Sequence, residues 1–482
     1  MNDFIVTGLE LAVLGTGLAV LLLDLWARPE QRRLLGYGAV IAVGVIFLAS
    51  FAVMPDGPRQ AFGGMYVLDE FALFFKRFFL LAALFVLVMA IEFSDRFDAG
   101  VSEYFALTLF ALLGMMVAAS ANDLTLLFVS LELITVTFYV LVGFQRRRQA
   151  SLEAAVKYLI LGALSSAFLV YGIALVYGSS GTMSFSKLAG VPVSILNSKL
   201  LWLGLLLVFV GLGFKVAAVP FQMWAPDVYQ GAPAPTTAFL AVGSKAAGVV
   251  LLLRLLHGAC PGLADRWQPL LMGVAALSIL YGVLGAIPQV NLKRLLGYSS
   301  IANAGYLLLG VATLSREGVT AVLFYLGGYL FTVLTAFMVI AVAMRQGGSE
   351  ETGSLAGLHR RSPLLALAMT LSMVSLAGVP PLAGFFGKLL LFKAAVAQTE
   401  SVPGFWWLLG VAVFGVVVSL WYYFGVIRAM YWAPESGELS PISVSGPVRW
   451  ALYGAMAAML WIGIMPNYIT NLADLAAGSL KP

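Results

Sequence analysis

The chain has 482 residues, of which 61% are hydrophobic and only 11% are charged, and its formal net charge is +5. Soluble domains are about one quarter charged, so this composition and the mean hydropathy of +0.96 exclude a soluble protein. The apolar segments are continuous instead of alternating over ~10 residues, which argues against a membrane β-barrel. The sequence therefore predicts an all-α polytopic membrane protein with no nucleic-acid partner.

Cysteine and histidine are scarce. Cys260 is the only cysteine in the sequence, which excludes an intramolecular disulfide and a cysteine-based metal cluster. The two histidines, His257 and His359, are too few for a histidine metal site. The N-terminus lacks the basic region and cleavage site of a signal peptide, so residues 4–26 are predicted to form a retained first span. We expect no metal and no cofactor in this chain.

In chain order, the apolar segments predict about fourteen membrane spans of ~20 residues each. They are expected near residues 4–26, 34–54, 71–92, 104–120, 123–143, 152–178, 200–219, 236–257, 268–287, 292–311, 318–343, 363–378, 404–431 and 448–466. Short apolar pieces follow Pro220 and Pro381, and proline removes a backbone donor and clashes with the preceding turn. Two of the helices are therefore predicted to be broken.

Lysine and arginine in the short loops set the orientation of such a protein. Most of them follow odd-numbered spans, as Arg146, Arg147 and Arg148 do. The loops after odd-numbered spans are therefore expected in the cytoplasm, and both termini are expected on the periplasmic side of a bacterial inner membrane. Lys293 and Arg294 begin a span, and their side chains are expected to extend toward the cytoplasmic face.

Two parts of the chain resemble each other. Residues 122–141 and 154–172 correspond in spacing to 290–309 and 320–338, and each set is followed by a span interrupted by glycine and proline. Matched broken helices are typical of transporters built from repeats, while chance similarity between apolar helices is the alternative.

The repeats predict a domain organisation with inverted topology, because each unit has an odd number of spans. The predicted units are an N-terminal three-helix segment (1–103), a first five-helix repeat broken at Pro220 (104–260), a second five-helix repeat broken at Pro380 and Pro381 (266–432), and a C-terminal helix (433–482).

The segment GFKVAAVPFQMW places Lys215 deep in a span, shortly before Pro220. An ionisable group at a helix centre costs ~2.5–3.5 kcal/mol on insertion scales and marks ion or proton pathways. The alternatives are a lysine that reaches an interface and a proline that makes only a structural kink. We interpret the two residues together as a hydrated pocket beside a broken helix.

Four other ionisable residues lie within predicted spans. Glu132 is mid-span and is expected to pair with Lys215 or to make a structural hydrogen bond. Lys157 lies near the start of its span, small residues flank Lys245, and Lys388 follows the second break. Buried groups that respond to one another's charge can pass protons. The candidate proton-carrying residues are therefore Glu132, Lys157, Lys215, Lys245 and Lys388.

Three segments carry a family resemblance. FKVAAVPFQMWAPDVYQGAPAPTTAFLAVGSKAAG (214–248), NLKRLLGYSSIANAGYLL (291–308) and SLAGVPPLAGFFGKLLLF (375–392) resemble the antiporter-like subunits of respiratory complex I, the NADH–quinone oxidoreductase. The form WAPDVYQGAP is most similar to the N-type. The resemblance extends over nearly the whole chain. It implies a fourteen-helix fold with two inverted five-helix repeats, which translocates protons using redox energy released elsewhere in the complex.

The resemblance also implies roles and partners. Glu132 matches the fifth-helix glutamate, Lys157 a sixth-helix lysine, and Lys215 the partner lysine on the broken seventh helix. Lys245 matches the central lysine and Lys388 the terminal residue, where lysine is similar to the N-type and unlike the M-type. K-type and M-type neighbours, the lipid bilayer and internal water are the expected partners. NADH, FMN, iron–sulfur clusters and quinone are expected in other subunits.

Two positions depart from the family pattern. Gln222 and Asn303 stand where many relatives have histidine, and neither amide can be protonated at working pH. A mechanism that needs titratable histidines there is in doubt, whereas the lysine row is unaffected. The alternatives are a subunit of an Mrp-type cation/proton antiporter and an inert scaffold, and the cost of the buried charges argues against the scaffold. The sequence leaves open whether the ion is H⁺ or Na⁺.

Overall fold

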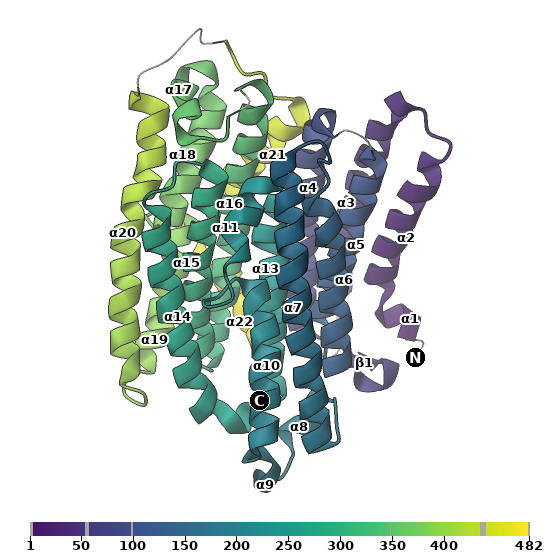
Figure 1. Ribbon diagram of the computed structural model, residues 1–482, viewed down its shortest axis with the longest axis vertical. Coiled ribbons are helices and arrows are strands. Elements are labelled where there is room, and N and C mark those ends of the chain that lie inside the picture. The colour runs from purple at the N-terminus through teal and green to yellow at the C-terminus, as the bar shows by residue number, and fades with distance from the viewer. Residues whose placement is uncertain (1–2, 54–56, 98–99, 348, 434–439, 481–482) are drawn as a thin grey trace.

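The computed structural model describes residues 3–53, 57–97, 100–347, 349–433 and 440–480, and the account below concerns these residues. Backbone groups in lipid must find partners within the chain, and a helix satisfies them locally. The long apolar segments accordingly form helices, most of which run along the long axis of the molecule (Figure 1). The few residues of the predicted units that lie outside these ranges fall mainly in the first and last units.

The N-terminal segment contains three long helices and a small β-hairpin. Its elements are α1 (Asp3–Val6), α2 (Gly8–Asp24), α3 (Arg32–Ala49), β1 (Arg59–Ala61), β2 (Tyr66–Leu68) and α4 (Glu70–Phe93). The strands pair antiparallel, with Arg59 opposite Leu68. Helix α2 packs on α5 at one edge of the bundle (Figure 1).

The next group of helices contains the first break. Its elements are α5 (Val101–Ala119), α6 (Leu124–Val142), α7 (Gln149–Ser180), α8 (Phe185–Ala189), α9 (Val193–Leu196), α10 (Lys199–Val216), α11 (Trp224–Gly231), α12 (Ala234–Phe239) and α13 (Lys245–Gly258). A π-helical turn, Leu240–Ser244, joins α12 to α13, and the combined span is buried except at its last two residues.

The second group contains the second break. Its elements are α14 (Ala264–Ala286), α15 (Leu292–Ala312), α16 (Arg316–Gly347), α17 (Leu358–Arg361), α18 (Pro363–Ala377), α19 (Ala383–Ala397) and α20 (Gly404–Trp432). The chain ends with α21 (Gly446–Ile464) and α22 (Pro466–Ser479). Single 3₁₀ turns lie at Pro29–Gln31, Phe62–Gly64, Ser94–Arg96, Pro261–Leu263 and Thr352–Leu355.

The all-α membrane fold is confirmed, and each predicted span corresponds to a helix. Twelve described helices are long and apolar enough to cross a membrane. The other two predicted spans correspond to α2, with 17 residues, and α18, with 15. Both predicted breaks occur, between α10 and α11 and between α18 and α19. The sequence reasoning missed the π-helical turn and α22, which starts at Pro466 directly after α21.

The packing of the two groups is similar. Helix α7 packs against α10 and α11, the two halves of the first broken helix, and α16 packs in the same way against α18 and α19. Helices α7 and α16 have the same length of 32 residues. The groups meet where α11 packs on α15 and α12 packs on α16.

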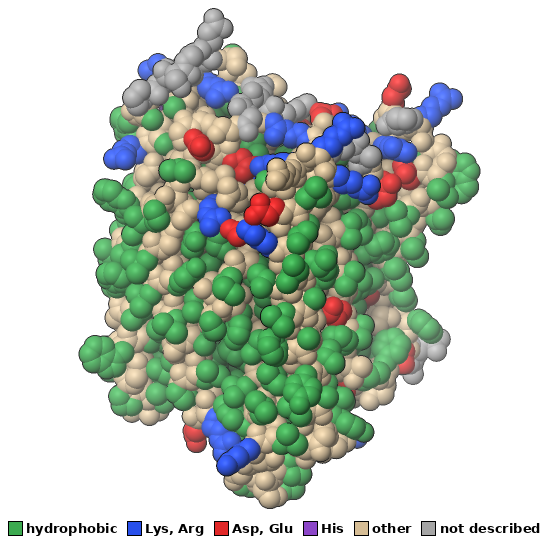
Figure 2. All heavy atoms as spheres, viewed as in Figure 1, with side chains coloured by type: hydrophobic (Ala, Val, Ile, Leu, Met, Phe, Trp, Pro, Cys, Tyr) green, Lys and Arg blue, Asp and Glu red, His purple; other side chains and the backbone are tan. Residues whose placement is uncertain are grey.

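Charged side chains gather at one end of the molecule. Figure 2 shows lysine, arginine and carboxylate side chains in a band at the end where α17 and the start of α7 lie, above a broad apolar belt. We call this end, which carries Arg148, Arg294 and Glu350, the basic face. The β-hairpin and the chain termini lie toward the other end, here called the terminal face (Figure 1).

Candidate functional site

Lys215 lies in the last turn of α10 and is 3% exposed. Its Nζ donates to the hydroxyl of Tyr158 on α7 at 3.2 Å and lies 5.5 Å from the centre of that ring. Helix α13 comes close beside it, because a Cβ at Gly248 would lie 3.1 Å from Lys215 Cβ. The helix thus ends with an ammonium group enclosed between three helices.

The first break is held by side-chain contacts. Helix α10 ends at Val216, and the next residue, Ala217, has a left-handed φ of 62°. The Val219–Pro220 peptide bond is cis. The freed groups find partners, since Trp224 Nε1 donates to the carbonyl of Phe214 and the Val219 amide donates to Ser278 Oγ, both at 2.9 Å. Gln222 Oε1 is buried without a hydrogen-bond partner in the described protein.

Glu132 lies on α6, is partly buried, and accepts a hydrogen bond from Ser166 on α7. Among the described residues, Glu132 and Lys215 form no direct ion pair. The structure therefore differs from the pairing that the sequence led us to expect. Helices α6 and α10 both pack against α7, and each of the two side chains has its printed partner on that helix. Two tyrosines connect the helices, since the ring of Tyr139 on α6 lies 5.4 Å from the ring of Tyr158 on α7, and the Tyr139 hydroxyl is buried without a described partner.

Lys157 lies near the start of α7, where the sequence placed it in its span. Its side chain is 43% exposed near the basic face, because it lies close to the start of α7. It pairs with Glu153 at 2.7 Å and with Asp227 of α11 at 2.8 Å. Asp227 also pairs with Arg294 of α15 at 2.5 Å. The sequence reasoning missed Asp227, although it lies in the WAPDVYQGAP segment.

Lys245 is 2% exposed and begins α13, directly after the π-helical turn. Its Nζ donates to both the carbonyl and the hydroxyl oxygen of Ser300 on α15. The hydroxyls of Tyr229 and Tyr329 also reach Ser300 Oγ, at 3.0 and 3.4 Å. Single π-helical turns are frequent at functional sites, and this one sets the position of the central lysine.

Lys388 lies on α19 and is 4% exposed. Its Nζ donates to the carbonyls of Leu376 and Ala377, at 2.8 and 3.3 Å, and lies 5.0 Å from the centre of the Tyr306 ring. These carbonyls form the C-terminal end of α18, where the helix dipole favours a cation. The second break therefore places an ammonium group at the end of a half-helix.

Along α15, polar side chains lie between Ser300, which holds Lys245, and Tyr306, whose ring lies beside Lys388. Asn303, on the same helix as Ser300, accepts from the Tyr325 hydroxyl at 2.6 Å and donates to Ser299 at 3.3 Å. Ser299 shares a hydrogen bond of 2.5 Å with the Tyr423 hydroxyl on α20. Asn303, which stands where many relatives have histidine, therefore lies at a junction between three helices.

Other buried charges escaped the sequence reasoning. Lys76 is completely buried on α4 and pairs with Glu10 at 2.8 Å, and Arg254 pairs with Asp69 at 2.7 Å. Lys76 interrupts the apolar run EFALFFKRFFLL, which was a readable signal. Lys293 is also completely buried, so the expectation that it extends to the face is wrong. Among the described residues, no group of three His, Cys, Asp or Glu side chains could hold a metal ion.

Comparisons with known proteins agree with this architecture. A family described as NADH:quinone oxidoreductase/Mrp antiporter, TM, matches residues 121–419. The chain is 40% identical to the NADH-quinone oxidoreductase subunit N of Desulforamulus reducens, over 99% of this chain and 98% of that one. A chain of respiratory complex I from Thermus thermophilus is 34% identical, with a TM-score of 0.80 and coverage of 97% and 99%.

A chain of the Mrp complex from Dietzia sp. DQ12-45-1b has a TM-score of 0.86 over 99% of this chain and 97% of that one. Its sequence identity is only 22%, so this likeness concerns the fold alone. The higher identity thus lies with the complex I relatives.

Proposed function

Because this chain belongs to the NADH:quinone oxidoreductase/Mrp antiporter family and is about as long as the N subunits that it matches, we propose that it carries protons along its buried lysines. It is a membrane subunit of a proton-translocating NADH–quinone oxidoreductase and does no redox chemistry itself. NADH, FMN, iron–sulfur clusters and quinone belong to other subunits in this proposal. Quinone reduction elsewhere in the complex drives the proton movement.

The observation that carries the proposal is the burial of three ammonium groups without carboxylates. Lys215, Lys245 and Lys388 are each at most 4% exposed, and within the described ranges none forms an ion pair. A charge at this depth costs ~2.5–3.5 kcal/mol on insertion scales, and such groups mark proton relays. Hydroxyl and carbonyl partners, unlike carboxylates, leave each lysine able to give up its proton without stranding a buried negative charge.

The order of the contacts suggests a route. Glu132 responds to the neighbouring subunits, and its charge acts on Lys215 across Tyr139 and Tyr158. A proton lost from Lys215 passes to Lys245, which Ser300 holds. It then passes through the Asn303 junction to Lys388 and leaves on the terminal face. Lys157 and Asp227 belong to the surface from which protons enter.

The proposal includes the surroundings of the chain. The predicted units 1–103, 104–260, 266–432 and 433–482 remain our domain assignment, supported by the similar packing of α7 and α16 on their broken helices. The multi-pass chain is placed in a bacterial inner membrane, with the basic face in the cytoplasm and both termini in the periplasm. Other membrane-arm subunits are its partners, and we assign K-type and M-type neighbours to its sides.

Replacing Lys215 with alanine tests the proposal. The variant removes the ammonium group that touches Tyr158, and we expect the assembled complex to lose the proton translocation that passes through this chain. Proton uptake into vesicles during NADH oxidation measures it. Translocation at the wild-type level would contradict the proposed role. Copurification of the tagged chain with redox subunits distinguishes complex I from an Mrp antiporter.

Asn303→Leu is expected to slow translocation and to lower the free energy of unfolding by about 1–3 kcal/mol, because Tyr325 and Ser299 lose their buried partner. Asn303→His retains a donor and an acceptor and should therefore recover much of the rate. Proton-translocation rates and thermal midpoints of the two variants are compared. Equal rates in Asn303→Leu and wild type would remove this junction from the route.

A further inference from the structure

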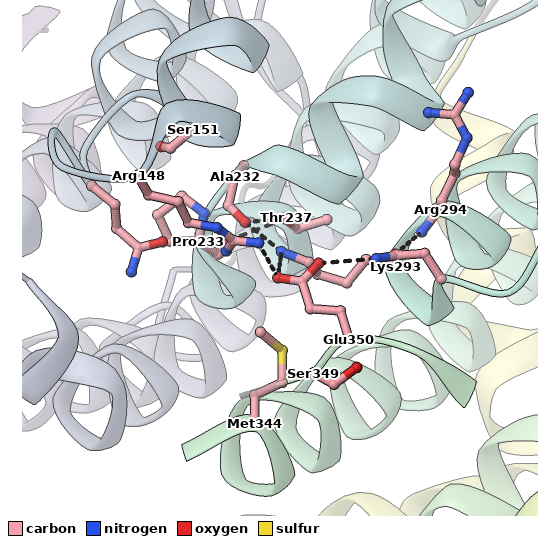
Figure 3. A network of polar contacts seen from close by, with 12 residues as sticks. Arg148, Ser151, Ala232, Pro233, Thr237, Lys293, Arg294, Met344, Ser349 and Glu350 are labelled. Carbon is pink, nitrogen blue, oxygen red and sulfur yellow. Dashed lines mark hydrogen bonds and ion pairs between the residues drawn. The ribbon is translucent and has the colours of Figure 1, made fainter. Parts of the chain in front are cut away.

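A buried ion pair lies just beneath the basic face. The side chain of Lys293, in the first turn of α15, is 0% exposed, and that of Glu350, in the segment after α16, is 6% exposed. Their charged atoms are 3.0 Å apart, and Lys293 Nζ also donates to the carbonyl of Ala232 at 2.8 Å. Figure 3 shows the ammonium group of Lys293 close to the carboxylate of Glu350. The proposed route described so far does not use them.

Glu350 connects this pair to the surface. Its Oε1 lies 2.5 Å from Arg148 Nη2, and the Arg148 side chain is 35% exposed. Its Oε2 accepts from Asn291 Nδ2 at 3.2 Å. Burial favours the neutral acid, but Lys293 and Arg148 outweigh burial and hold the pKa of Glu350 below its ordinary value. The carboxylate therefore lies between a partly exposed arginine and a fully buried lysine.

A row of polar groups, and not a continuous hydrogen-bond chain, leads from Lys293 toward the central lysine. The carbonyl of Ala232 that accepts from Lys293 also accepts from the Thr237 hydroxyl, at 3.5 Å. Thr237 Oγ1 lies 3.3 Å from the carbonyl of Tyr229, whose own hydroxyl reaches Ser300 Oγ at 3.0 Å. Ser300 is the residue that holds Lys245.

The helix geometry supports this connection. Lys293, Gly297 and Ser300 have the spacing that places residues on one face of a helix. A Cβ at Gly297 would lie 3.0 Å from Pro226 Cα, so α11 lies directly against that face of α15. Lys293 and Ser300 thus both contact the segment around α11, one near the surface and one in the interior.

We propose that Glu350 and Lys293 form a proton-uptake site, through which protons from the basic face reach Lys245 without passing Lys215. The inference rests on the proposed function of the lysine row. The Lys157 cluster, which loads Lys215, and this pair, which loads Lys245, act at successive steps of one cycle, so blocking either one stops translocation through this chain. A purely structural clamp between α15 and the loop after α16 is the competing explanation, since buried ion pairs can also fix a local arrangement.

The proton steps balance. In the resting state Lys293 is an ammonium and Glu350 a carboxylate. When Lys245 is neutral, Lys293 becomes an amine and gives its proton to internal water, which carries it past the hydroxyls of Thr237, Tyr229 and Ser300 to Lys245. Glu350 then takes a proton from water at the basic face and passes it to Lys293. Both groups regain their charges, and one proton has moved from the basic face to Lys245.

Lys293→Arg separates the two explanations. Arginine keeps the positive charge and the partners Glu350 and Ala232, but it does not release its proton in proteins. A clamp would survive this change, whereas a proton carrier would not. Glu350→Gln keeps the shape of the side chain and removes its ability to exchange a proton. We expect each variant, in the whole complex in lipid vesicles, to slow translocation through this chain by about 10²-fold.

The outcomes are distinguishable when Lys215→Ala is measured alongside. Loss in Lys293→Arg, Glu350→Gln and Lys215→Ala supports the uptake site. Wild-type rates in the first two with loss in the third overturn the uptake site and leave the proposed function standing. Wild-type rates in all three overturn both. If Lys293→Arg does not assemble, Glu350→Gln decides by the same readout. Asp474→Asn, which breaks the exposed pair with Arg316 on the other side of the bundle, is the matched control.

Discussion

Replacing Lys245 with methionine is expected to reduce proton translocation through this chain by about 10²-fold or more, because it removes a proton-carrying group from the middle of the route. Methionine is close to lysine in length and leaves no uncompensated charge, since Lys245 has hydroxyl and carbonyl partners on Ser300. The complex should therefore still assemble. The rate of proton uptake by vesicles during NADH oxidation measures the effect.

A matched control is available on another membrane helix. Lys393 lies on α19, one turn beyond Lys388, and its side chain is exposed. Lys393→Met removes the same ammonium group from a position that the proposed route does not use. Translocation should stay at the wild-type level. An equal loss of translocation in both variants would mean that removing any lysine from a membrane helix has this effect. The position of Lys245 on the route would then not be its cause.

The largest expected effect on stability is at Asp69. Asp69→Ala would leave the guanidinium of Arg254, whose side chain is 6% exposed, buried without its carboxylate. Breaking a buried pair in this way costs about 3–5 kcal/mol. Asp69 also accepts from the Ala72 amide at the start of α4, and losing such a cap costs ~1 kcal/mol more. The midpoint of heat-induced dissociation of the complex, and the amount of assembled chain, should both fall.

Asp474→Ala provides the comparison for Asp69→Ala. Asp474 pairs with Arg316 at 2.7 Å, but both side chains are at least half exposed. Exposed pairs are worth ~0–1 kcal/mol, so the midpoint should hardly change. Similar midpoints for the two variants would mean that the Asp69–Arg254 pair contributes no more than a surface contact.

The helices and their breaks could be predicted because their causes are local. An apolar run long enough to span lipid must be helical. Pro220 and Pro381 each interrupt the helix of the run in which they lie. The π-helical turn before Lys245 could not be predicted in this way. The turn contains no proline, and all five of its residues are buried inside the bundle, so no local sequence signal marks it.

The depth of the three central lysines also followed from their place in long apolar runs. The hydrogen-bond and ion-pair partners of these lysines could not be predicted from the sequence, because they depend on how the helices pack. Glu132 accepts from Ser166 and Lys215 donates to Tyr158, both on α7, and only the tertiary arrangement reveals these partners. Lys293 was expected at the surface, since it begins a span. It is buried because Glu350, from a loop far along the chain, and the Ala232 carbonyl close over it.

The central claim is that Lys215, Lys245 and Lys388 act in series on one proton route. Counting the protons translocated per NADH by complexes that carry Lys215→Ala, Lys245→Met or Lys388→Ala tests it most directly. A route in series predicts the same deficit for each variant, because the loss of any one residue stops the same cycle. A wild-type proton count in any one of the three, in a fully assembled complex, would contradict the account.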